Sequence, residues 1–178
     1  MRKIRGFTLI EAMVVVAIVA ILVSLAAPSF SSLIQANTIS NSVNTLLSDM
    51  RYARSESIRR GGDVVMCRSA TPESSGATCS SGNWNSGWIV FHDLDGDGVK
   101  DATDPILRVQ APLSAIDTIS ATGSEYRFRF SATGRLPVSE ATTLTFGGSN
   151  FESHIQRKVC VSVGGRGRIA GDGSSSCS

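Results

Sequence analysis

The chain has 178 residues, of which 42% are hydrophobic and 18% charged, and its formal net charge is +2. This size suits one globular domain with a substantial core and excludes two ordinary domains beside a membrane segment. Three of the 17 basic residues, Arg2, Lys3 and Arg5, fall within the first six positions. The remainder carries 14 bases against 15 acids and is therefore nearly neutral.

Charge is unevenly distributed along the chain. Residues 61–125 hold three bases and nine acids, whereas residues 126–178 hold seven bases and three acids. An acidic middle and a basic end are compatible with a surface for an anionic partner, and equally with a solvated charged surface.

The N-terminus combines a basic leader, residues 1–6, with an almost wholly apolar segment, residues 7–27. As a helix, this segment would span about 30 Å, which is the hydrocarbon thickness of a bilayer. We expect a transmembrane helix with its leader on the cytoplasmic side. An ordinary signal peptide is the alternative, because Ser24 and Ala26 offer small residues for cleavage. Glu11 argues against it, since an unpaired carboxylate in lipid is costly.

The segment Gly6-Phe7-Thr8-Leu9-Ile10-Glu11 resembles the prepilin processing motif of type IV pilins and type II secretion pseudopilins. The resemblance implies that a prepilin peptidase cleaves after Gly6 and methylates the new amino group of Phe7. It also implies that Glu11 pairs with the amino terminus of a neighbouring pilin subunit. The expected location is the bacterial inner membrane, single-pass with a periplasmic head, followed by the pilus or pseudopilus.

Residues 28–60 are expected to form the amphipathic half of the stalk helix. Pro28 should kink or loosen that helix, and Gly61-Gly62 should end it. Helical spacing predicts an apolar stripe that packs on the head, made of Val43, Leu46, Leu47, Met50, Ala53 and Ser57. Polar residues fall elsewhere on the helical wheel, namely Asn44, Asp49, Arg51 and Glu56.

Residues 61–178 are expected to form a β-rich head, which makes the fold class α+β with a long N-terminal helix packed on that head. Alternating residues bounded by turn formers predict strands at 63–68, 88–92, 106–110, 125–131, 142–146 and 157–163. In the fourth strand, Tyr126, Phe128 and Phe130 lie on one face, and Arg127 and Arg129 lie on the other. One face is therefore expected to be core and the other basic.

Four cysteines form two sequence-local pairs, and we expect the disulfides Cys67–Cys79 and Cys160–Cys177. An exported chain places its thiols in an oxidising compartment, where disulfides persist. Four cysteines allow three connectivities, so the sequence leaves the others open. Zinc-site spacing is absent from the sequence.

The order of features in the head extends the resemblance to the whole chain. Residues 52–57, 87–91 and 130–135, together with an Asp-rich loop, resemble the FimT/GspH family of minor pilins and pseudopilins. This resemblance implies a minor subunit rather than a major pilin.

The Asp-rich loop, residues 93–104, matches the early positions of an EF-hand calcium loop. Asp93, Asp95 and Asp97 occupy its first, third and fifth positions, and Gly98 its sixth. Asp104 replaces the bidentate glutamate of the twelfth position, and strands are expected on both sides. We therefore favour a hairpin whose carboxylates bond to their own backbone, with calcium as the alternative.

Neither an enzymatic activity nor a cofactor is expected. His92 and His154 fall on strand edges or in loops, and the sequence contains no nucleophile elbow or phosphate-binding glycine loop that opens a helix.

The segment Gly165-Arg166-Gly167-Arg168 resembles the G-R-x-R motif of FimT minor pilins, which in that family is associated with DNA binding during natural transformation. Two arginines one residue apart on a glycine-flanked strand or turn are suited to binding the phosphates of double-stranded DNA. The resemblance implies that Arg166 and Arg168 make the main contacts. Supporting roles are expected for Lys158, Arg157 and Arg135.

Two alternatives remain open at this stage. The arginines are equally compatible with solvation, or with capping of the sheet through acids such as Asp172. The chain would then be a structural minor pilin or a secretion pseudopilin that primes filament assembly without binding nucleic acid.

Overall fold

The structure, a computed structural model, describes residues 7–173 and 175–177, without the side chains of residues 25–29 and 124. The chain divides into two compact units, residues 1–35 and 36–178. The helix α1 (Leu9–Arg60) begins in the first unit and ends in the second.

In the first unit, α1 continues through Pro28 as one uninterrupted helix. Side chains between residues 7 and 24 are all exposed. Within the described residues, no helix combines the length and the apolarity needed to cross a membrane.

The end of α1 follows the expected capping geometry. Gly61 adopts a left-handed conformation with φ of 64°, and the backbone N–H of Gly62 donates to the carbonyl oxygen of Ser57 at 3.3 Å. This is the bond of a Schellman cap, which satisfies a carbonyl of the last turn. The predicted end of the helix at the glycine pair is confirmed.

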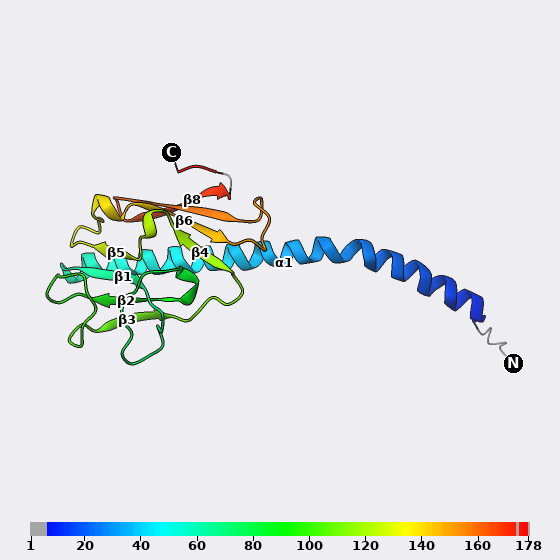
Figure 1. Ribbon diagram of the computed structural model, residues 1–178, viewed down its shortest axis with the longest axis horizontal. Helices are drawn as coiled ribbons and strands as arrows, with labels where there is room; N and C mark the ends of the chain where they lie inside the picture. Colours follow the sequence, from blue (N-terminus) through cyan, green and yellow to red (C-terminus); the bar gives the residue numbers. More distant parts are fainter. Residues whose placement is uncertain (1–6, 174, 178) are drawn as a thin grey trace. The chain divides into compact units, whose positions relative to one another are not determined.

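The second unit contains two four-stranded antiparallel sheets, shown in Figure 1 with the C-terminal half of α1. Sheet A has the order β3-β2-β1-β5, and sheet B the order β4-β6-β7-β8. The strands are β1 (Val64–Arg68), β2 (Trp88–His92), β3 (Ile106–Gln110), β4 (Thr118–Ala121), β5 (Arg127–Phe130), β6 (Thr142–Gly147), β7 (Arg157–Ser162) and β8 (Arg166–Asp172). Six of them match predicted strands to within two residues at each end, whereas β4 and β8 were not predicted as separate strands.

The core lies where α1 meets the inner faces of both sheets. The predicted apolar stripe of the helix is confirmed, because all six of its members are buried: Val43, Leu46, Leu47, Met50, Ala53 and Ser57. Aromatic side chains fill the centre, and Trp84 stacks on Phe128 with ring centroids 5.1 Å apart. The buried hydrophobic core of the described residues and both disulfides lie within residues 36–178. This part therefore has the means to fold alone.

Two of the residues that the helical wheel assigned to the polar side of α1 are nevertheless buried. Asp49 is 4% exposed and accepts hydrogen bonds from the indole of Trp88 at 2.8 Å and from Arg108 at 2.6 Å. Glu56 is 9% exposed and pairs with Arg59 and Arg60. Specific partners therefore replace water around these carboxylates.

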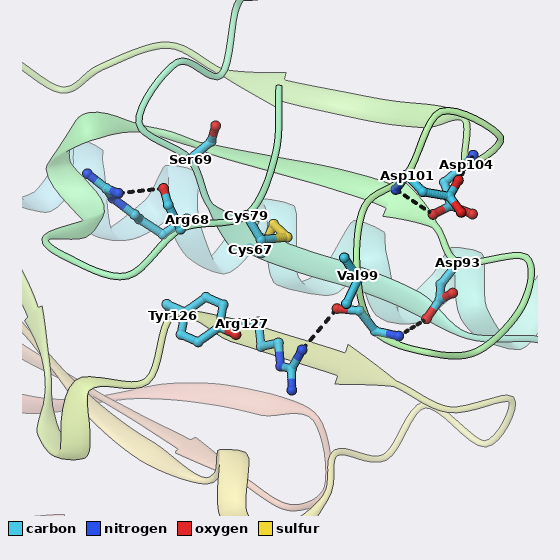
Figure 2. The surroundings of a disulfide bond; sticks show 12 residues. Cys67, Arg68, Ser69, Cys79, Asp93, Val99, Asp101, Asp104, Tyr126 and Arg127 are labelled. Atoms are coloured by element: carbon cyan, nitrogen blue, oxygen red, sulfur yellow. Dashed lines mark hydrogen bonds between the residues drawn. A yellow bond between two sulfur atoms is a disulfide. The ribbon is translucent and has the colours of Figure 1, made fainter. Parts of the chain in front are cut away.

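The alternation predicted for β5 is confirmed, because Phe128 and Phe130 are buried, whereas Arg127 and Arg129 lie on the other face. The arginines of this outer face contact other parts of the head. Arg129 forms an ion pair with buried Glu140 at 2.5 Å, and Arg127 donates to the carbonyl oxygen of Gly98 at 3.0 Å. Figure 2 shows that second contact, beside the disulfide Cys67–Cys79. Both arginines are therefore committed to contacts within the head.

Candidate nucleic-acid interface and assembly motif

The predicted basic motif lies on a hairpin formed by β7 and β8. Pairing of Ser162 with Arg166 leaves a three-residue loop, residues 163–165. The backbone N–H of Gly165 donates to the carbonyl oxygen of Ser162 at 2.9 Å, and Gly165 has φ of 67°. A glycine in this left-handed conformation is characteristic of three-residue hairpin loops.

Neither Gly165 nor Gly167 has room for a side chain. A Cβ on Gly165 would collide with the carbonyl oxygen of Gly134, and a Cβ on Gly167 would lie 2.5 Å from Cδ2 of Leu47 on α1. Gly167 therefore faces the helix. Because side chains alternate along a strand, the flanking residues Arg166 and Arg168 project from the opposite, outward face. Both arginines are exposed.

An open hollow of about 660 Å³ lies on this outward face. Its lining residues include Arg166 and Arg168 together with Thr142 and Thr143 of β6 and Ser162 of β7. Two of these hydroxyl groups donate to backbone carbonyl oxygens, that of Thr142 to Thr122 at 2.7 Å and that of Ser162 to Arg166 at 3.2 Å. Guanidinium and hydroxyl groups are the donors that most often contact phosphate oxygens. The hollow therefore has the chemistry of an anion site.

The disulfide Cys160–Cys177 forms one wall of this hollow, as both cysteines are among its lining residues. It connects β7 to the segment after β8 and matches the predicted pairing, as does Cys67–Cys79.

The three predicted supporting bases are in different positions. Lys158 and Arg157 are adjacent on β7, so their side chains point to opposite faces, and Lys158 shares the outward face of Cys160. Arg157 donates to three nearby carbonyl oxygens, including that of His154 at 2.7 Å. Arg135 lines a separate hollow with Asp63 and Arg129. Of the three, only Lys158 therefore lies on the outward face that Arg166 and Arg168 share.

Sequence reasoning missed the hydroxyl residues of the site. Thr142 and Thr143 are on β6, and they approach the arginines only because β6 pairs with β7 and β7 with β8. The sequence provided no signal for this register, since threonine is common in strands of every kind.

The Asp-rich loop has the self-bonded geometry expected of a hairpin. Asp93, which is 4% exposed, accepts the backbone N–H groups of Gly96 and Gly98 at 2.9 and 2.8 Å. Asp104 accepts those of Leu94 and Asp101 (Figure 2). Burial raises the pKa of Asp93, which opposes the ionised form that calcium needs.

Carboxylate oxygens of Asp93, Asp95 and Asp97 nevertheless lie within 4.8 Å of one another. Calcium binding by this loop stays an untested alternative.

The predicted assembly motif begins α1. Gly6 lies outside the described residues, whereas Phe7 is 81% exposed. Thr8 and Glu11 cap the helix reciprocally: the Glu11 carboxylate accepts the N–H of Thr8, and Thr8 Oγ1 accepts the N–H of Glu11, both at 3.4 Å. This arrangement is a capping box, and it gives Glu11 a local partner in the single chain.

Comparison with known proteins places these features in a family. A family model described as type II transport protein GspH matches residues 42–165, which is more than half of the chain. The chain belongs to the GspH family. A second model, the prokaryotic N-terminal methylation motif, matches residues 1–27. Members of the GspH/FimT family are type IV minor pilins and pseudopilins, which are structural proteins of filaments.

Two solved structures share the fold of this GspH-family chain. Both are crystal structures of the type IV minor pilin FimU of Pseudomonas aeruginosa. The first has a TM-score of 0.60 and 19% identity and covers 78% of this chain and 95% of its own. The second has a TM-score of 0.57 and 18% identity, and the match covers 76% of this chain and 98% of the FimU chain. The expected pilin fold is confirmed.

The family match ends at residue 165, immediately before Arg166. The matched region contains the scaffold that holds the β7–β8 hairpin, and both arginines lie beyond it. The family match therefore does not assign a role to Arg166 and Arg168.

Proposed function

We propose that this GspH-family protein is a minor type IV pilin that binds double-stranded DNA through Arg166 and Arg168 for uptake in natural transformation. It would act as a non-catalytic receptor. The observation that carries the proposal is the placement of both arginines on the outward face of β8, in one open hollow. This face presents donors to an anion without burying them.

The expected binding is electrostatic and independent of DNA sequence. Phosphate contacts release counterions, so affinity falls steeply with salt. The hairpin that carries Arg166 is held by a hydrogen bond from Leu136 to the carbonyl oxygen of Val163 at 2.9 Å. The disulfide Cys160–Cys177 holds the segment beyond it. A restrained site loses less conformational entropy on binding, which supports a preformed receptor.

Processing and anchoring are proposed from the N-terminal motif. A prepilin peptidase would cleave after Gly6 and methylate Phe7, leaving residues 7–27 as the inner-membrane anchor and residues 28–60 as the rest of the stalk. Residues 61–178 would then be the periplasmic head. Glu11 would exchange its capping partner Thr8 for the amino terminus of a neighbouring pilin, since both are compatible with a carboxylate at a helix N-terminus.

DNA binding is tested with the unit formed by residues 36–178. In a gel-shift assay at low salt this head should retard duplex DNA, and Arg166→Ala combined with Arg168→Ala should abolish the shift. A matched control, Arg59→Ala with Lys100→Ala, removes the same charge outside the hollow and should retain the shift. Absence of any wild-type shift, or an unchanged shift in the double variant, would contradict the receptor role.

A second candidate function is structural, a minor pilin or secretion pseudopilin that primes assembly without binding nucleic acid. The match to the type II transport protein GspH favours it. The two candidates separate in cells that carry the Arg166→Ala/Arg168→Ala variant. Loss of pili with a folded head supports the assembly role, whereas normal pili with lost DNA uptake support the receptor.

A further inference from the structure

A second hollow, of about 380 Å³, lies between α1 and the β7–β8 turn. Arg51 and Arg54 of the helix line it together with Arg166, and its floor is formed by Leu47, Met50, Gly165 and Gly167. Arg166 is a lining residue of both hollows, so the two hollows adjoin at this residue. The helical arginines are 115 and 112 positions away from it in the chain, and no local pattern marks them as binding residues.

Three arginines are among the residues that line this hollow. Of the described residues that line this hollow, none carries a carboxylate. The nearest acids along α1 have other partners: Asp49 accepts from Trp88 and Arg108, and Glu56 pairs with Arg59 and Arg60. A hollow edged by three bases without an acid is an electrostatic site for an anion.

Arg54 is held in place by the protein. Its Nε donates to the carbonyl oxygen of Gly134 at 3.1 Å, and this uses the inner nitrogen of the guanidinium. Gly134 has φ of 70°, and a Cβ there would lie 2.8 Å from Nε of Arg54. The turn at Gly134 therefore holds Arg54 through its Nε. The two terminal guanidinium nitrogens, Nη1 and Nη2, are the donors suited to a phosphate.

Arg51 is exposed and precedes Arg54 by three residues on the same helix. Residues three apart are neighbours on a helix surface, which is why both reach one hollow. Arg51 supplies a solvated base beside the restrained one.

We propose that the phosphate backbone of DNA crosses the β7–β8 turn and continues from Arg166 and Arg168 onto Arg51 and Arg54 of α1. This inference rests on the proposed function. It extends the footprint from one strand to a path over two elements, and it makes the stalk helix part of the receptor surface. The ligand class is a polyanion with successive phosphates.

The test is binding of a fluorescent duplex to residues 36–178, measured by anisotropy over a range of salt. Arg51→Gln should raise the Kd about fivefold and lower the magnitude of the salt slope by about one. Arg59→Gln is the matched control, because it removes an exposed arginine of the same helix outside both hollows and should change the Kd by less than about twofold.

NMR gives an independent readout in the unmodified head. The side-chain Nε–H resonances of Arg51 and Arg54 should shift when duplex DNA is added. If Arg51→Gln matches Arg59→Gln and neither resonance shifts, while Arg166→Ala/Arg168→Ala still weakens binding, the extended path is wrong and the receptor site stands. If the wild-type head binds no DNA, both proposals fail.

Discussion

Gly167 of β8 packs against Leu47 of α1 so closely that a Cβ on the glycine would lie 2.5 Å from the leucine Cδ2. This contact explains why the basic motif alternates glycine with arginine. The glycine positions allow the strand and its turn to approach the helix and the Gly134 turn, and the arginine positions between them are directed to solvent. Close packing and exposed positive charge therefore fall on alternate residues of the motif.

Replacing Gly165 with alanine should lower the free energy of unfolding by about 3 kcal/mol, the sum of left-handed strain and overpacking. Gly61 is a matched control with φ of 64° and no atom within 4 Å of its added Cβ. Gly61→Ala should therefore cost only about 1 kcal/mol, from strain alone. Chemical denaturation of the head measures both, and equal losses would show that Gly165 does not make the close contact.

Removal of the Asp49 carboxylate should strongly destabilise the head. Asp49→Ala leaves the buried indole N–H of Trp88 without its acceptor and Arg108 without its ion-pair partner. We expect a loss of about 3 kcal/mol. Asp49→Asn keeps an acceptor for Trp88 and should therefore lower the free energy of unfolding by less than Asp49→Ala does. Thermal unfolding gives the ranking, and a larger loss for asparagine than for alanine would contradict this account.

Glu56 should contribute a pH-dependent part of the stability. Hydrogen bonds from Arg59 and then Arg60 lower the pKa of Glu56 from 4.5 to about 2. Because the folded pKa is lower than the unfolded value, the stabilisation is complete above pH 4.5 and disappears as the pH falls toward 2. Arg59 is 65% exposed, so water screens the pair and the expected contribution is about 1 kcal/mol.

Comparison of the wild type with Glu56→Gln measures this contribution. The difference in unfolding free energy between them should be constant near neutral pH and shrink during acidification. A difference that stays constant down to pH 2 would mean that the ion pairs do not stabilise the fold.

The disulfide Cys160–Cys177 should support both stability and binding. It closes a loop with a sequence separation of 17 residues, and its removal by two serine substitutions should cost about 3 kcal/mol. Because one wall of the Arg166–Arg168 hollow is then released, the Kd for duplex DNA should rise about fivefold at a temperature where the variant is folded. Calorimetry measures the loss of stability, and anisotropy measures the change in Kd. An unchanged Kd would show that the disulfide does not support DNA binding.

Local patterns in the sequence were sufficient for the helix and most strands. The stripe from Val43 to Ser57 was readable because its spacing alone determines which side of the helix it occupies. Asp49 was assigned to the polar side, since its partners Trp88 and Arg108 are 39 and 59 residues away. No local pattern encodes such distant partners.

The missed strands have physical explanations as well. In β4 only Ile119 is buried, which is too little for a period-two pattern. In β8 the inward position is occupied by Gly167, because Leu47 leaves no space for the apolar side chain that usually reveals a strand. Arg51 and Arg54 were overlooked for a related reason, as only the tertiary fold places the helix beside the turn.

The central claim, DNA binding by Arg166 and Arg168, is tested most directly by the salt dependence of duplex affinity. The logarithm of the association constant should fall linearly with the logarithm of salt concentration for the wild-type head. The Arg166→Ala/Arg168→Ala variant should bind more weakly with a slope smaller in magnitude by about two, one for each lost phosphate contact. Equal affinities and slopes in the two proteins would contradict the claim.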